Sequence, residues 1–135
     1  MSVTDPAFDA VVREAFTAFN ERRFADFSTY VTDDLVEIYP QSGEVVVGKQ
    51  AERAMHEAFP DPPTFGVRAI HRDGNLAVVE VDEGYHDGTT WKTVFILTLR
   101  NGLIAGLTGY FGEPFAPAPW RRPFVTARDS LGPVD

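Results

Sequence analysis

The sequence predicts an α+β domain in which three N-terminal helices pack on a strongly curved antiparallel sheet. Two patterns predict this architecture. Apolar residues recur at helical spacing near the N-terminus, and Asp-Gly or Asn-Gly pairs then stand at 73–74, 87–88 and 101–102 between β-rich runs. Such pairs favour the positive φ angles of tight hairpins, so a meander of four strands follows the helices. The chain has 135 residues, which suits one domain.

The three helices are expected in the first 60 residues. Thr4-Asp5-Pro6 is typical of a helix start, and an apolar stripe runs from there to about Asn20. A second, short helix carries apolar residues from Phe24 to Val31, and a third covers about 49–59. The residues expected to face inward on the third helix are Ala51, Ala54, Met55, Ala58 and Phe59.

The strands are expected to begin at Leu35. A first strand over 35–39 ends at Pro40, and 44–47 pairs back on it. The four strands of the meander cover about 64–72, 75–86, 89–100 and 103–112. We therefore interpret 1–135 as a single domain with 113–135 as an extended, Pro-rich tail. Because that tail is also rich in aromatic residues, we expect it to wrap over the domain or over a partner.

Composition excludes several classes of function. The formal net charge is −8, which disfavours binding to nucleic acid or to an anionic membrane. The absence of cysteine excludes disulfides and thiolate chemistry. We find neither a signal peptide nor an apolar run of the roughly 20 residues that a membrane span needs. A cytoplasmic location is the resulting expectation.

The candidate catalytic acids come from the second strand of the predicted meander, about 75–86. If Asp87-Gly88 forms a tight two-residue turn, Glu80 lies opposite Phe95, and Asp82 lies opposite Thr93. Both acids then share a face with Trp91, and desolvation by aromatic side chains raises the pKa of a carboxyl group. Such a carboxyl serves as an acid or base near neutral pH. We therefore predict Glu80 and Asp82 as catalytic residues.

Two alternatives for these acids stay open. In the first, Val79 and Val81 face the helices, while Glu80 and Asp82 face solvent. In the second, the acids pair with Arg68 or Arg72 and serve the structure alone.

Two further side chains are candidates for the same site. Tyr39 could donate a hydrogen bond to a ligand carbonyl, or it could be a core tyrosine. His86 could carry protons at the pocket mouth, or it could be a solvated turn histidine. The histidines follow neither HxH nor HExxH spacing, so we expect no metal ion and no cofactor.

Several segments resemble the NTF2-like superfamily, in particular its SnoaL-like members, whose cone is also described as cystatin-like. They are the first helix ending in Phe19-Asn20, the segment Tyr30-Val31-Thr32-Asp33-Asp34 and Gly48-Lys49. The segments 101–104 and 110–114 and the tail with Ala118-Pro119-Trp120-Arg121 also resemble this group. The resemblance covers nearly the whole chain and implies the fold more specifically than the chemistry, since this fold hosts isomerases, cyclases, dehydratases and binding proteins.

Ketosteroid isomerases are the members that this chain most clearly resembles in layout. By position, their catalytic base corresponds to Tyr39, their oxyanion tyrosine to Ala15 or Phe16, and their protonated aspartate to Leu97. All three residue types differ, so the resemblance implies the cavity without that mechanism.

The resemblance and the acids together suggest a small-molecule site. We expect cofactor-independent isomerisation, cyclisation or dehydration of an apolar, polyketide- or steroid-like molecule by acid–base proton transfer. The expected substrate-binding residues are Phe16, Trp91, Phe95, Leu97, Leu107 and Phe111. The alternative is a non-catalytic module for ligand binding or dimerisation. Because both faces of the sheet are partly apolar, a homodimer through the outer sheet face is also expected.

Overall fold

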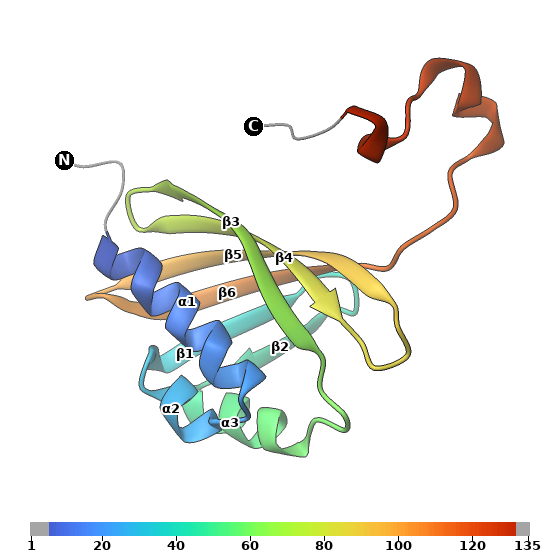
Figure 1. The fold of residues 1–135 in the computed structure, drawn as a ribbon. Helices are drawn as coiled ribbons and strands as arrows, with labels where there is room; N and C mark the ends of the chain where they lie inside the picture. The colour runs from blue at the N-terminus through green and yellow to red at the C-terminus, as the bar shows by residue number, and fades with distance from the viewer. Residues whose placement is uncertain (1–5, 132–135) are drawn as a thin grey trace.

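The computed structural model describes residues 6–131, and the predicted helix cap at Thr4 and Asp5 lies outside them. Helices and a curved sheet form two layers (Figure 1). The helical elements are α1 (Pro6–Asn20), α2 (Phe24–Ser28), α3 (Lys49–Ala58) and the 3-10 helices η1 (Pro119–Phe124) and η2 (Arg128–Leu131). The strands are β1 (Val31–Tyr39), β2 (Glu44–Val47), β3 (Thr64–Asp73), β4 (Leu76–Gly84), β5 (Thr90–Arg100) and β6 (Leu103–Gly112).

The six strands form one sheet in the order β2-β1-β6-β5-β4-β3. All neighbours are antiparallel except β1 and β6, which run parallel. The predicted α+β class with helices on one curved sheet is confirmed. The second helix is shorter than expected, because Val31 begins β1 instead of ending the helix.

The core lies between α1 and the concave face of the sheet. Along β4 and β5 every second residue is buried, as a sheet covered on one face requires. Side chains that are almost inaccessible to solvent fill the space between α1 and the sheet. The fully or nearly fully buried residues include Val12, Ala15, Leu35, Ala77, Val79 and Leu97.

The register of β4 on β5 differs from the prediction by one residue. The N–H group of Tyr85 donates to the Thr89 carbonyl at 2.9 Å, so three residues, 86–88, form the loop instead of two. Gly88 takes the positive φ of 88° that such a loop needs. As a result Glu83, not Gly84, lies opposite Trp91. A one-residue change in register exchanges the two faces of a strand.

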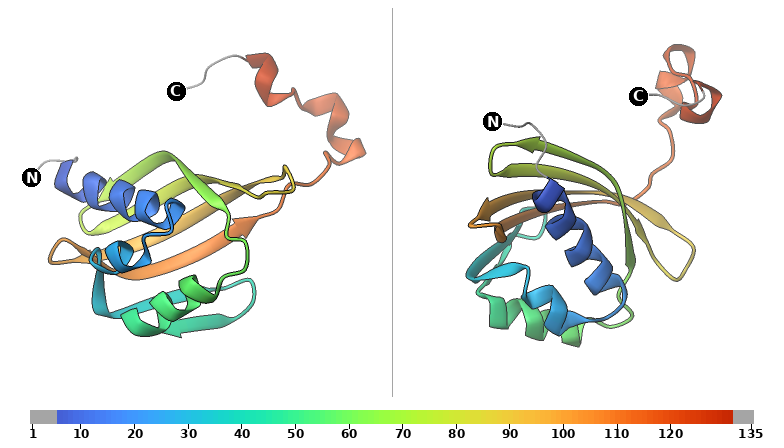
Figure 2. Two further views of the ribbon diagram at one scale, coloured as in Figure 1. Left: turned by 60° about the horizontal axis from the view of Figure 1, so that its bottom comes forward. Right: turned by 60° about the vertical axis from the view of Figure 1, so that its left-hand side comes forward.

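The C-terminal arm, defined here as residues 113–131, leads away from the domain (Figure 2). Phe115, Trp120 and Phe124 are 82%, 72% and 82% exposed. Of the two arrangements expected for the tail, wrapping over its own domain is therefore not the one observed. No helix among residues 6–131 is long and apolar enough to cross a membrane.

Candidate active site

A cavity of about 680 Å³ opens at the end of the sheet where β1, β4 and β6 finish. Aromatic side chains form most of its wall. They include Phe16 and Phe19 of α1, Phe65 of β3, Trp91 and Phe95 of β5 and Phe111 of β6. Rings contact one another along this wall, with Phe95 lying 5.4 to 5.8 Å from Phe16, Phe65 and Phe111, centroid to centroid. The cavity is thus suited to an apolar ligand.

One asparagine and one glutamine side chain connect the elements that surround this cavity. Asn20, at the end of α1, donates to the Phe65 carbonyl at 2.7 Å and accepts from the Phe65 N–H group at 2.8 Å. Gln41, in the β1–β2 turn, makes the same pair of bonds with the backbone of Phe111, at 2.9 and 2.5 Å. These bonds hold α1 to β3, and the β1–β2 turn to the end of β6.

A first group of polar side chains reaches the cavity from β1 and α3. Glu37 is 2% exposed, and it accepts a short hydrogen bond from the Tyr39 hydroxyl two residues along the same strand face. Glu52 and His56, one turn apart on α3, are 1% and 8% exposed. Glu37, Tyr39 and His56 line the cavity, whereas Glu52 is not among its lining residues.

Glu52 is best described as a protonated acid. Burial raises the pKa of Glu52 far above its ordinary value, and a hydrogen bond to Glu37 adds to this effect. Neither Glu52 oxygen has a hydrogen-bond donor among the described residues, so an ionised Glu52 would be an unpaired buried charge. Protonation of Glu52 removes that cost, and a protonated Glu52 is a suitable donor for the neighbouring Glu37 carboxylate.

The pKa values of Tyr39 and His56, which lie beside the Glu37–Glu52 pair, shift so that both side chains are neutral. Burial, followed by the charge of Glu37, raises the pKa of Tyr39, so its hydroxyl keeps its proton. Burial lowers the pKa of His56, and Nδ1 of this ring has no hydrogen-bond partner in the described part of the chain. His56 is therefore a neutral imidazole with one free ring nitrogen.

Three of these four residues, without Tyr39, form a cluster that could hold a metal ion. Glu37, Glu52 and His56 each offer a donor atom, and these atoms lie within 4.8 Å of one another. Two carboxylates and an imidazole suit a divalent transition metal. A bound metal would take the place of the proton on Glu52, because carboxylate ligands bind a metal in their deprotonated form.

A second polar group reaches the cavity from β4 and β5. Glu83 is 2% exposed and accepts hydrogen bonds from the Thr93 and Tyr85 hydroxyls, both at 2.7 Å. Burial, followed by the bond to Glu83, raises the pKa of Tyr85. The ring of Tyr85 lies 5.2 Å from that of Trp91, centroid to centroid. Glu-x-Tyr thus occurs twice, at 37–39 and 83–85, and lines the cavity from two strands.

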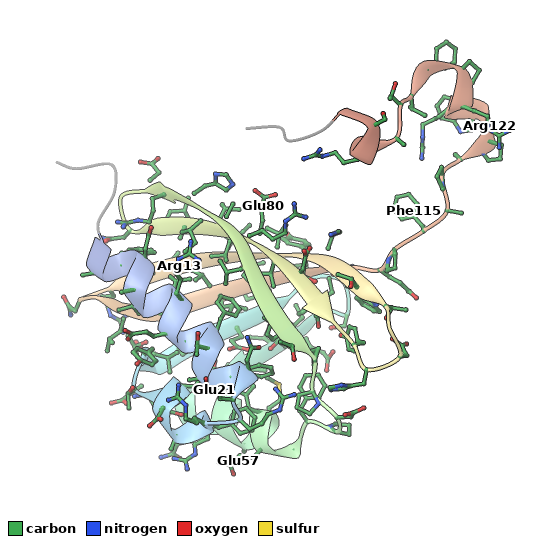
Figure 3. All side chains as sticks on the ribbon, viewed as in Figure 1. Arg13, Glu21, Glu57, Glu80, Phe115 and Arg122 are labelled. Carbon is green, nitrogen blue, oxygen red and sulfur yellow. The ribbon has the colours of Figure 1, made fainter. Side chains whose placement is uncertain are left out.

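The prediction that Glu80 and Asp82 face the cavity is wrong. Glu80 is exposed on the outer surface (Figure 3), where its carboxylate lies 2.6 Å from His71 Nε2. Asp82 lies 2.8 Å from Lys92 and 3.5 Å from Arg68. Burial opposes its ionisation, yet these cations hold the pKa of Asp82 below its usual range. The three-residue loop explains the error. The alternative in which these acids face outward describes both of them, and pairing with Arg68 describes Asp82 but not Glu80, which contacts His71.

The other predicted site residues divide into two groups. Tyr39, Phe16, Trp91, Phe95, Leu107 and Phe111 line the cavity. Leu97 is buried in the core at 1% exposure and is not a lining residue, and His86 is exposed on the β4–β5 loop. His86 Nε2 lies 3.1 Å from the Pro62 carbonyl and 3.4 Å from Asp61, so it joins two loops.

The acids that the sequence analysis missed are Glu37, Glu52 and Glu83, together with His56. On α3 the alanines at 51 and 54 were expected to face inward, but they are exposed, and the buried residues are Glu52 and His56. The repeated Glu-x-Tyr was the one available signal, because residues two apart share a face of a strand.

Comparison with known proteins gives the family. The profile of the SnoaL-like domain family matches residues 12–107. An NTF2-like protein of unknown function from Burkholderia xenovorans LB400 is 31% identical, with a TM-score of 0.80 over 90% of this chain and 94% of that one. A proposed ketosteroid isomerase from Kribbella flavida DSM 17836 is 24% identical, with a TM-score of 0.82 over 90% of this chain and 89% of that one.

More distant structures share the fold alone. An LEH-like epoxide hydrolase of Mycobacterium tuberculosis is 16% identical, with a TM-score of 0.66 over 78% of this chain and 82% of that one. A search of curated proteins finds no match. The profile match covers most of the chain, and the relative at 31% identity covers nearly all of it. The chain therefore belongs to the SnoaL-like family of the NTF2-like superfamily.

Proposed function

We propose that this protein is an enzyme that moves a proton on an apolar small molecule without a cofactor, in an isomerisation, cyclisation or dehydration. The observation that carries the proposal is the buried Glu37–Glu52 pair, which reaches an aromatic cavity of about 680 Å³ through Glu37. A carboxylate in a dry site is a strong base, and one that shares a proton is also an acid.

The residues divide the work as follows. Glu37 accepts a proton from a carbon or hydroxyl group of the ligand, and Glu52 adjusts the charge of Glu37 from behind. Once Glu37 has taken the proton, the Tyr39 hydroxyl, which keeps its own proton, turns from Glu37 and donates to the oxygen on which negative charge develops. The aromatic wall excludes water and holds the ligand skeleton. This assignment replaces Glu80 and Asp82, whose contacts with His71 and Lys92 keep them on the outer surface.

The open cavity favours this proposal over a non-catalytic module. A module for dimerisation needs no cavity. The cavity of this protein has the volume of a ligand site, and its buried acids have no cationic partner among the described residues. A protein that only binds the same apolar ligands would keep the aromatic wall but would not depend on Glu37. That difference decides the experiment.

The test is proton exchange at carbon. Tetralone, a cyclohexenone and a steroid enone are incubated with the protein in deuterium oxide, and exchange next to the carbonyl group is followed by NMR. The wild type should accelerate exchange of at least one of them over buffer, and Glu37→Gln should reduce the acceleration about 100-fold or more. Glu80→Gln, the matched control, should leave it unchanged. Ligand binding with no exchange above buffer, or full exchange in Glu37→Gln, would refute the proposal.

We also propose a homodimer through the outer sheet face. Apolar residues gather on its β2, β1 and β6 side, where Val47, Val45, Ile38 and Tyr110 are 69%, 54%, 41% and 44% exposed. The exposed aromatic residues of the C-terminal arm need a partner surface as well. Light scattering after size exclusion should give the dimer mass, and Ile38→Glu with Val45→Glu should give the monomer. A monomeric wild type at micromolar concentration would contradict this proposal.

A further inference from the structure

The cavity is unbalanced in charge. Its described lining residues include three acids, Glu37, Glu44 and Glu83, and neither lysine nor arginine. None of the ion pairs between residues 6 and 131 involves Glu37, Glu52 or Glu83. Lys49 acts on Glu52 from a distance, but its ammonium group pairs with Asp33 at 3.2 Å.

The histidine of the site does not correct this imbalance. Burial lowers the pKa of His56, so the ring is neutral at physiological pH. Protonation of Glu52 removes one of the two charges that the Glu37–Glu52 pair could carry. The carboxyl groups of Glu37 and Glu83 therefore have no cation beside them in the described part of the chain, although a buried carboxylate is almost always paired with one.

Glu83 is the better placed of the two to bind a cation. Thr93 and Tyr85 each donate to one of its oxygens at 2.7 Å, which fixes the carboxylate group in position but adds no positive charge. Each carboxylate oxygen can accept a second hydrogen bond. The side chain is 2% exposed and lines the cavity, so a group that supplies that donor has to reach Glu83 from inside the cavity.

Two aromatic rings stand beside this carboxylate. Trp91 lies directly opposite Glu83 in the β4–β5 register, and the Tyr85 ring lies 5.2 Å from the Trp91 ring at an interplanar angle of 54°. The face of an indole or phenol ring attracts cations, most strongly where water is excluded. A carboxylate next to two such rings is a suitable environment for an ammonium group.

We infer that the ligand of this cavity has an apolar skeleton that carries a protonated amine, and that the ammonium group binds between Glu83, Tyr85 and Trp91. This inference rests on the proposed function and narrows its substrate class. Anionic ligands such as carboxylates and phosphates are excluded by the same charges. The reacting end of the ligand then lies toward Glu37 and Tyr39 on β1, across the cavity from the amine.

The test uses three probes with one skeleton, namely naphthylmethylamine, naphthylmethanol and naphthoate. Calorimetry on the wild-type protein should give a Kd for the amine at least about tenfold below that of the alcohol, and no binding of the carboxylate. In Glu83→Gln, which keeps the shape and removes the charge, the amine and the alcohol should bind within about twofold of each other. Glu80→Gln, on the outer face of the same strand, should keep the wild-type preference.

A second measurement needs no variant, in case Glu83→Gln does not fold. A naphthyl probe with a trimethylammonium group is compared with its uncharged tert-butyl isostere on the wild-type protein. Tighter binding of the cation, weakened by added salt, supports the inference. Equal or tighter binding of the tert-butyl probe or of the alcohol, or an amine preference that survives in Glu83→Gln, overturns it.

These results separate the inference from the proposed function. An amine preference with no carbon–proton exchange supports the inference and refutes the enzyme proposal. Exchange that depends on Glu37, with no preference for cationic probes, supports the enzyme proposal and refutes the inference.

Discussion

Glu83 and Glu80 are three residues apart on β4, and they lie in opposite environments. Glu83 faces the cavity, is 2% exposed and has only hydroxyl donors, whereas Glu80 is exposed on the outer surface beside His71. Asp82, also on the outer surface, has Lys92 and Arg68 beside it. On the outer surface, where water could solvate them, the acids are paired with basic groups. In the cavity, where water has little access, Glu83 has no basic partner among the described residues. An arrangement that costs stability is expected at a functional site.

The largest effect is expected from placing a new acid on each face. Val79→Glu introduces a carboxylate at a fully buried position, and should lower the free energy of unfolding by about 4 kcal/mol or more, or prevent folding. Val78→Glu, its neighbour on the outer face, should change it by about 1 kcal/mol or less. Urea unfolding measures both. Similar losses in the two variants would contradict the assignment of the faces.

Removing one donor of Glu83 should have the next largest effect. Thr93→Val keeps the shape of the side chain but leaves Glu83 Oε1 without its 2.7 Å hydrogen bond. We expect the free energy of unfolding to fall by about 1 to 3 kcal/mol, because an unsatisfied buried acceptor is costly. Thr90→Val, at an exposed position of the same strand, is the control. A loss no greater than that of the control would show that Thr93 does not support Glu83.

The raised pKa of Glu52 should make stability depend on pH. The folded state keeps this proton, whereas the unfolded state releases it above its ordinary pKa of about 4.3. Stability that is complete below that pH is therefore lost as pH rises toward the folded pKa, by at most about 1.4 kcal/mol per pH unit.

The measurement is the Tm between pH 7 and 9, where His56 is neutral in the folded state and mostly neutral in the unfolded state. The wild type should lose stability over this range, and Glu52→Gln should lose much less. Glu57→Gln, which is exposed on the same helix and paired with Arg53, should behave as the wild type. Parallel curves for the wild type and Glu52→Gln would mean that Glu52 is ionised in the folded protein.

The smallest effects are expected on the outer face. Glu80→Gln and Asp82→Asn remove exposed pairs with His71 and Lys92, which are each worth about 1 kcal/mol or less. Neither change should alter binding of the naphthyl probes. A loss of binding in Asp82→Asn alone would show that the outer face supports the cavity.

The fold could be predicted from the sequence because its signals are local. The Asn101-Gly102 turn has the two positive φ angles, 54° and 79°, that its residue types favour, and the strands on both sides pair as expected. The apolar stripe of α1 likewise follows helical spacing and is buried as that spacing predicts.

The site was harder to predict, because neither the position of Glu83 nor that of Glu52 follows from the local sequence pattern. One extra residue in the loop at 86–88 decides whether Glu80 or Glu83 faces the cavity, and Asp-Gly is compatible with either loop length. On α3 the polar Glu52 and His56 are buried while Ala51 and Ala54 are exposed, the reverse of what hydrophobicity predicts. Only the neighbouring Glu37, distant in sequence from α3, makes that arrangement understandable.

The central claim is that the Glu37–Glu52 pair keeps a proton at neutral pH, and infrared spectroscopy tests it most directly. The carbonyl stretch of a protonated carboxyl group is separate from the bands of carboxylates. The wild type should show this band at neutral pH, Glu52→Gln should lose it, and Glu80→Gln should keep it. A wild-type protein without the band, or a band that survives in Glu52→Gln, would contradict the account.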